Sequence, residues 1–180
     1  MFKDFDISSF KKMKPPGDNT FDTSQEIKAL AKIPLKKDFV KKFDNIEAAF
    51  AKTAKDNNVK DYDKKIPAKL IKESAPIILK LKKHFNRPRP KVLAKKMNVK
   101  MKDYEMDSMK TPSYPSGHSV QGILIAKVLG DKHPKAKSAF AKTGKNISYS
   151  RRVAHAHYKS DSKMGEKLGN SMYNFIKNKI

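Results

Sequence analysis

Cysteine and tryptophan are absent from this chain of 180 residues, and so are long apolar runs. Without cysteine, neither a disulfide framework nor a zinc site built from thiolates is possible. The longest apolar run, residues 122–126, ends at Lys127 and falls far short of the ~18 residues that cross a bilayer. Residues 1–6 are charged, and no apolar core of a signal peptide follows them. We therefore expect a soluble, cytoplasmic protein without a transmembrane segment.

Arginine is scarce, although basic residues dominate the charge. Lysine and arginine together number 41 against 18 acidic residues, which gives a formal net charge of +23. The lysines are spread along the whole chain, so the charge acts as a field that attracts anions. Small phosphate esters, nucleic acid and anionic membrane surfaces all fit such a field. Nothing in the sequence arranges side chains to read base edges, so we do not expect nucleic acid to be required.

The four arginines of the chain are clustered in two places. Arg87 and Arg89 form one pair, and Arg151 and Arg152 form the other. Arginine has a rigid planar fork that binds two phosphate oxygens at once, whereas lysine is a flexible point charge. The use of arginine at these two places, in a chain that otherwise uses lysine, therefore indicates that they need a defined geometry as well as charge.

Apolar residues recur with the helical period, and no segment alternates as a strand would. A capping box at residues 23–26 predicts the start of one helix, and the apolar stripe over 39–50 predicts a second. A third helix is predicted around residues 70–81, kinked or divided at Pro76. These patterns predict an all-α, single-domain bundle of six or seven helices.

The second half of the chain contains the most apolar of the predicted helices. Residues 91–114 lack a strong period and predict a loop with room for a short helix. The helix after Gly117 is apolar on most sides, which predicts a central position in the bundle. Further helices are predicted after Pro134 and over residues 164–176. Residues 1–20, which include Pro15-Pro16-Gly17, are expected to form an N-terminal arm before a helical domain over 21–180.

Three short stretches contain side chains suited to binding and transferring phosphate. They are Lys82 with Arg89-Pro90, then Pro115-Ser116-Gly117-His118, and then Ser150-Arg151 with His157 and Asp161. Proline on both sides of Arg89 predicts that the helix carrying Lys82 ends before Arg89. Ser116 is suited to cap the apolar helix, and the same geometry makes a helix N-terminus a site for anions.

The order and spacing of these residues resemble the signature of the type 2 phosphatidic acid phosphatase superfamily. This superfamily contains class A bacterial acid phosphatases, membrane lipid phosphatases and vanadium-dependent haloperoxidases. The chain is most similar in character to the soluble class A enzymes. The resemblance implies an all-α phosphomonoesterase that needs neither a metal nor another cofactor. It also implies a small phosphorylated substrate, with phosphate or vanadate as ligands of the site.

The resemblance implies a role for each residue of the three stretches. His157 is the nucleophile that forms a phosphohistidine, and His118 is the general acid. Asp161 accepts a hydrogen bond from one ring nitrogen of His157 and so leaves the other nitrogen bare for attack. The phosphoryl oxygens are bound by the remaining positions, which are Lys82, Arg89, Ser116, Gly117 and Arg151.

The sequence leaves several alternatives open. His155 and His157 with His118 suggest a metal pair, although residues two apart point to different sides of a helix and no carboxylate ligand is apparent nearby. A vanadate-dependent haloperoxidase of the same fold and a lysine-rich nucleic-acid-binding protein with a vestigial site are alternative functions. Many family members have Gly and Pro where this chain has His155 and Lys159, which leaves the substrate range open. The sequence also leaves open whether the reaction is hydrolysis or phosphotransfer, and what the oligomeric state is.

Overall fold

The computed structural model describes residues 1–102 and 104–179, and the regular structure within these ranges is helical, without strands. The all-α prediction is confirmed, and seven of the described helices have eight or more residues. The elements are α1 (Ser8–Lys11), α2 (Phe21–Ala31), α3 (Lys37–Asp44), α4 (Ile46–Asp56), α5 (Lys65–Phe85), α6 (Pro90–Lys96), the 3₁₀ turn η1 (Asp107–Lys110), α7 (Gly117–Lys132), the 3₁₀ turn η2 (Pro134–Ala136), α8 (Lys137–Val153) and α9 (Lys159–Ile176).

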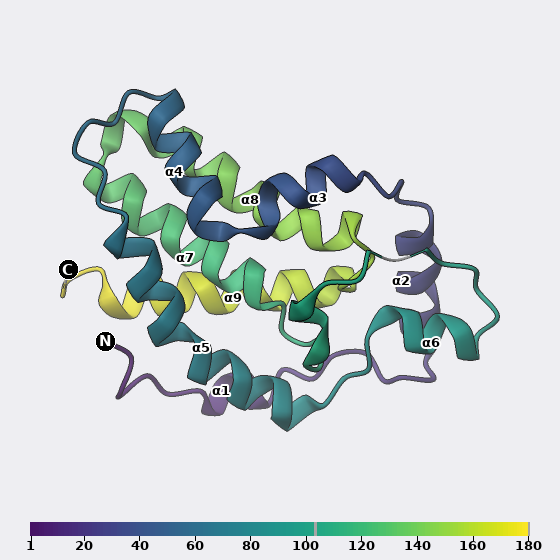
Figure 1. Cartoon of the computed structure of the whole chain (residues 1–180). Helices are drawn as coiled ribbons and strands as arrows, with labels where there is room; N and C mark the ends of the chain where they lie inside the picture. Colours follow the sequence, from purple (N-terminus) through teal and green to yellow (C-terminus); the bar gives the residue numbers. More distant parts are fainter. Residues whose placement is uncertain (103, 180) are drawn as a thin grey trace.

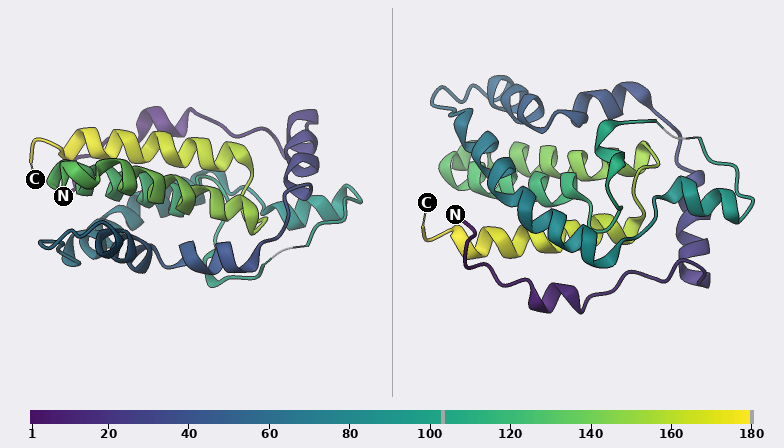
Figure 2. Two further views of the ribbon diagram at one scale, coloured as in Figure 1. Left: turned by 90° about the horizontal axis from the view of Figure 1, so that it is seen from above. Right: turned by 60° about the horizontal axis from the view of Figure 1, so that its bottom comes forward.

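Helix α7 occupies the centre of the bundle, as its apolar sequence predicts (Figure 1). Its side chains are buried on nearly all sides, and it packs most extensively against α8 and α9. Figure 2 shows α3 and α4 on one side of these three helices and α1 on the other. Helices α2 and α6 lie together at one end of the bundle. No helix in the described part of the chain is both long and apolar enough to cross a membrane.

The apolar stripe over residues 39–50 belongs to two helices, so the prediction of one continuous helix is wrong. The chain breaks at Asn45, which has an extended backbone (φ −85°, ψ 103°) between α3 and α4. The Asn45 side chain accepts a hydrogen bond from the Ala48 N–H at 2.9 Å and so caps α4. Both Phe43 and Ile46 are buried, and the apolar period therefore conceals the break.

Two further helix boundaries differ from the prediction. Helix α2 begins at Phe21, because Thr20 caps it by accepting from the Thr23 N–H at 3.3 Å. The predicted capping box at residues 23–26 is therefore wrong, and the Glu26 side chain contacts another part of the molecule. Helix α5 is not divided at Pro76. It ends before Arg89, as predicted, with Asn86 in the left-handed conformation (φ 47°).

The segments predicted as arm and loop contain short helices. Residues 1–20 include α1, and Phe2 and Phe10 of this segment are buried in the main core. The division into an arm and a domain at residue 20 stays a prediction. The stretch 91–114 contains most of α6 and the turn η1 among its described residues.

Helices α7 and α9 approach each other closely at their N-terminal ends. A Cβ atom placed on Gly165 would lie 2.6 Å from the carbonyl oxygen of Ser116, which is too close for any real side chain. At the same place, the Ser116 N–H donates to the carbonyl oxygen of Asp161 at 3.1 Å. Glycine on α9 therefore allows the second and third of the sequence stretches to meet.

We expect Gly165→Ala to destabilise the protein by about 1–3 kcal/mol, because the added methyl group must push the backbones of α7 and α9 apart. Gly130→Ala is the matched control. It is also a helical position, but its closest contact, at 3.0 Å, is the flexible Lys137 side chain. The free energy of unfolding of both variants is measured by chemical denaturation. Equal stability of the two variants would contradict the close approach.

Candidate active site

His157 and Asp161 form a buried pair where α8 gives way to α9. Nδ1 of His157 lies 2.9 Å from Oδ2 of Asp161, and the same oxygen accepts from the Tyr158 N–H at 3.1 Å. Because an ionised carboxylate only accepts, His157 donates from Nδ1 and its Nε2 carries the lone pair. Asp161 is the third residue of α9 and lies in its first turn, whereas the N-cap position is occupied by Tyr158.

Two cations lie near the C-terminal end of α5, and one of them, Arg89, donates to Nε2 of His157. Nη1 of Arg89 is 2.9 Å from Nε2 of His157. Nε and Nη2 of Arg89 donate to the carbonyl oxygens of Thr111 and Ser108, each at 2.8 Å. Lys82 donates to the carbonyl oxygen of Pro112 at 2.5 Å. Residues 108–112 therefore hold both cations in place through main-chain acceptors.

Arg151 and His118 meet at Asp44, the last residue of α3. Nη1 of Arg151 donates to Oδ1 of Asp44 at 2.8 Å, while its buried Nη2 has no hydrogen-bond partner among the described residues. Nε2 of His118 lies 2.9 Å from the Asp44 carbonyl oxygen. A carbonyl only accepts, so Nε2 donates and Nδ1 is the nitrogen left to exchange a proton. The break at Asn45 provides this carbonyl, because the Asn45 side chain takes the Ala48 N–H instead.

Ser116 and Gly117 lie at the start of α7, next to this pair. The Ser116 side chain caps α7 by accepting from the Ser119 N–H at 3.3 Å, as predicted. Its own N–H is already bonded to the Asp161 carbonyl, so Ser116 also connects α7 to α9. Gly117 is the first residue of the helix, where N–H groups have no partner within the helix and can bind an anion.

The concentrated positive charge shifts the titration of the neighbouring groups. Burial, followed by the charge of Arg89, lowers the pKa of Lys82 to about 7. Burial, followed by the charge of Arg151, lowers the pKa of His118 to about 4. The pKa of His157 is well below its usual value, through burial and then Arg89. Both histidines are therefore neutral at neutral pH, and a bound anion would relieve the repulsion among the cations.

A cleft of about 860 Å³ leads from the surface to Arg89 and His118. Tyr104, Met106 and Met109 contribute an apolar wall. The rim carries both acidic and basic side chains, namely Lys91, Glu105, Asp107 and Lys110. The cleft gives a small molecule a route to the cationic cluster.

The structure thus brings all the predicted site residues to one end of the bundle and adds three that the sequence analysis did not assign. These three are Glu26, Asp44 and Arg87. The sequence gives a signal for Arg87, because it is one of the four clustered arginines. Glu26 belongs to the predicted capping box, and Asp44 lies in a stretch whose one signal is its apolar period. Neither acidic residue had a local signal for a role in the site.

His155 does not join His157 in a metal pair. Its Nε2 lies 2.7 Å from the Ile33 carbonyl oxygen, and its Nδ1 contacts the carbonyl oxygen of Lys102. His155 has a positive φ of 56°, a conformation that favours glycine. The described residues contain no group of three or more histidine or acidic side chains arranged to hold a metal ion.

Comparison with known proteins finds two that are similar to part of this chain. The chain is 36% identical over 88 residues to a non-specific acid phosphatase of Salmonella typhimurium and 35% identical over 88 residues to one of Salmonella typhi. Each match covers 49% of this chain and 35% of the relative's own length. Both names fit the class A acid phosphatases that the sequence motifs resemble. No family model matches the chain.

We expect sulfate to bind at the cationic cluster and to bind more weakly as the pH rises through about 7, because Lys82 loses its proton there. Sulfate keeps its charge over this pH range, so a change in its affinity reflects the titration of a group on the protein. The loss of one charged contact is expected to cost about 10-fold in affinity, measured by calorimetry. Lys82→Arg keeps its charge and should flatten the profile. A wild-type affinity that does not change with pH would contradict the assignment of Lys82 to this site.

Proposed function

We propose that this chain is a phosphomonoesterase of the acid phosphatase type, acting through a phosphohistidine at His157. The observation that supports this most is the position of His157, whose Nδ1 is held by Asp161 while Nε2 faces the guanidinium of Arg89. A nucleophile beside a phosphate-binding cation is the arrangement that phosphoryl transfer requires. The similarity to two acid phosphatases supports the same reaction.

In the first step, the phosphoryl oxygens bind Lys82, Arg89 and Arg151, and Nε2 of His157 attacks phosphorus. The N–P bond forms as the ester P–O bond breaks, and the cations stabilise the charge on the phosphoryl oxygens. The bound phosphate raises the proton affinity of nearby His118, which donates a proton from Nδ1 to the leaving alkoxide. Asp161 stabilises the positive charge that develops on the His157 ring.

In the second step, His118 accepts a proton from water, and the hydroxide attacks phosphorus. The N–P bond breaks, His157 returns to its neutral state, and His118 holds the proton taken from water until phosphate leaves. An alcohol in place of water would give phosphotransfer by the same route. The cations in this scheme are side chains of the protein, so neither step needs a metal ion.

We predict that His157→Ala abolishes turnover of both alkyl and nitrophenyl phosphates, because no covalent intermediate can form. His118→Ala should slow formation of the phosphoenzyme from an alkyl ester by about 10²–10⁴-fold more than from a nitrophenyl ester, because nitrophenolate leaves without a proton. Rapid-quench single-turnover experiments measure this step separately from hydrolysis of the intermediate. An equal loss on both esters would show that His118 is not the general acid.

We predict that activity survives prolonged treatment with EDTA, because every proposed phosphate ligand is a cationic side chain or a main-chain amide. Turnover of nitrophenyl phosphate is compared before and after the treatment. The control is the treated enzyme with zinc or magnesium added back. Loss of activity that either metal restores would contradict the proposed mechanism and support a metal site with histidine ligands.

A further inference from the structure

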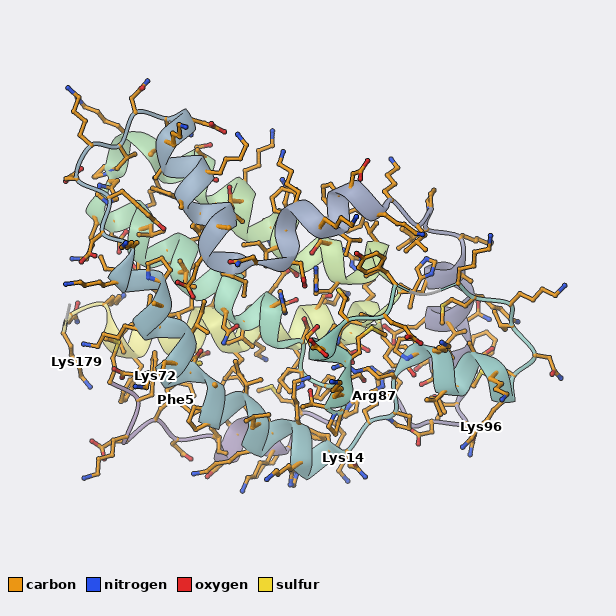
Figure 3. All side chains as sticks on the ribbon, viewed as in Figure 1. Phe5, Lys14, Lys72, Arg87, Lys96 and Lys179 are labelled. Atoms are coloured by element: carbon orange, nitrogen blue, oxygen red, sulfur yellow. The ribbon has the colours of Figure 1, made fainter. Side chains whose placement is uncertain are left out.

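Arg87 is buried at the opposite end of the His157–Asp161 pair from Arg89. Its Nη1 donates to Oδ1 of Asp161 at 2.8 Å and to Oγ of Ser160 at 2.7 Å. Its guanidinium lies 3.7 Å from the centre of the Tyr158 ring. Figure 3 labels Arg87, which lies on the connection between α5 and α6. Only 1% of the Arg87 side chain is exposed, so its contacts are directed entirely into the protein.

Glu26 of α2 completes the network on the far side of Arg87. Its Oε2 accepts from Nη2 of Arg87 at 3.3 Å and from the Ser160 hydroxyl at 2.7 Å. Its Oε1 accepts from the Ser160 N–H at 2.7 Å. Charges of alternating sign therefore run from Glu26 through Arg87 to Asp161, and the neutral ring of His157 follows.

We propose that Arg87 is a positioning residue that keeps Asp161 ionised and thereby fixes the tautomer of the nucleophile His157, and that Glu26 is a positioning residue that holds Arg87 and Ser160 in place. Glu26 lies outside the three stretches, and Arg87 lies within the first of them without being one of its motif positions. The inference rests on the proposed function, because it assigns these two residues to the phosphohistidine step.

The physical reason is the burial of the Asp161 carboxylate. A buried carboxylate without a cation takes up a proton instead of staying charged. Protonated Asp161 would donate to Nδ1 of His157, so the proton of the neutral ring would move to Nε2. The lone pair that attacks phosphorus would then be lost. Arg87 prevents this by supplying a positive charge and a hydrogen bond to Oδ1.

The network also matches the change of charge during the reaction. Glu26, Arg87 and Asp161 together carry one net negative charge, and formation of the phosphohistidine adds one positive charge to the ring. Arg87 and Arg89 therefore do different work although they are only two residues apart. Arg89 faces the nitrogen that binds phosphorus, and Arg87 faces the carboxylate that stabilises the opposite side of the ring.

The test compares Arg87→Met with Arg152→Met, which removes the same charge from an arginine that stacks on Tyr149, outside the network. Nitrogen-15 NMR of the histidine rings reports the tautomer of His157 whether or not the protein is active. We expect Arg87→Met to move the proton from Nδ1 to Nε2, and Arg152→Met to leave it in place. Single-turnover formation of the phosphoenzyme should fall by about 10–100-fold in Arg87→Met, the range seen when outer partners that orient a ligating histidine are lost.

A second comparison shows whether Arg87 acts through Asp161. In an Asp161→Asn background, Arg87→Met should cause little further loss, because the carboxylate it supports is already gone. Arg87→Lys keeps a positive charge and should retain the wild-type tautomer. If Arg87→Met does not fold, Glu26→Gln replaces it, with Glu47→Gln on the exposed side of α4 as control. Glu26→Gln should slow phosphoenzyme formation several-fold, because the network loses the negative charge that balances the new cation.

The outcomes separate this inference from the proposed function. A wild-type protein that forms phosphoenzyme, with Arg87→Met matching Arg152→Met in both tautomer and rate, overturns the inference. Equal rates for Glu26→Gln and Glu47→Gln overturn it as well. A tautomer shift in Arg87→Met without any phosphoenzyme in the wild-type protein would support the positioning role and reject the proposed function.

Discussion

A single buried carboxylate, that of Asp161, organises this end of the molecule. A fully buried charge must be compensated by a cation and by hydrogen bonds, and Asp161 receives both from different parts of the chain. Arg87 comes from the connection between α5 and α6, and His157 and the Tyr158 N–H come from the entry to α9. The main-chain carbonyl of Asp161 accepts a hydrogen bond from the Ser116 N–H at the start of α7. The side chain and the main-chain carbonyl of one residue therefore connect three segments around the proposed nucleophile.

Much of the fold could be predicted because its signals are local. The apolar faces of the helices, the central position of α7 and the end of α5 before Arg89 all follow from neighbouring residues. The candidate site could also be predicted in part, since its motif residues have fixed spacing and the scarce arginines gather near them. The structure places Lys82, Arg89 and His118 around His157 without any of them being adjacent to it in sequence.

The features that could not be predicted depend on contacts between distant segments. A glutamate three residues after a threonine has the same pattern whether it caps its own helix or reaches another one, and Glu26 does the latter. Apolar residues continue in phase through Asn45, so periodicity could not reveal the break between α3 and α4. Asp44 has no motif of its own, and its position beside Arg151 depends on how α3 packs against α8.

The break at Asn45 has a consequence for how this site could vary. The group that sets the tautomer of His118 is a peptide carbonyl, which every amino acid possesses. The side chain at position 44 is consequently released from that duty and is 47% exposed at the cleft. The Asp44 carboxylate instead accepts from Nη1 of the buried Arg151 at 2.8 Å, so a change of charge at position 44 would leave that cation unpaired, while the orientation of the His118 imidazole is inherited from the backbone. In this way one residue positions the proposed general acid with its backbone and the proposed phosphate ligand with its side chain.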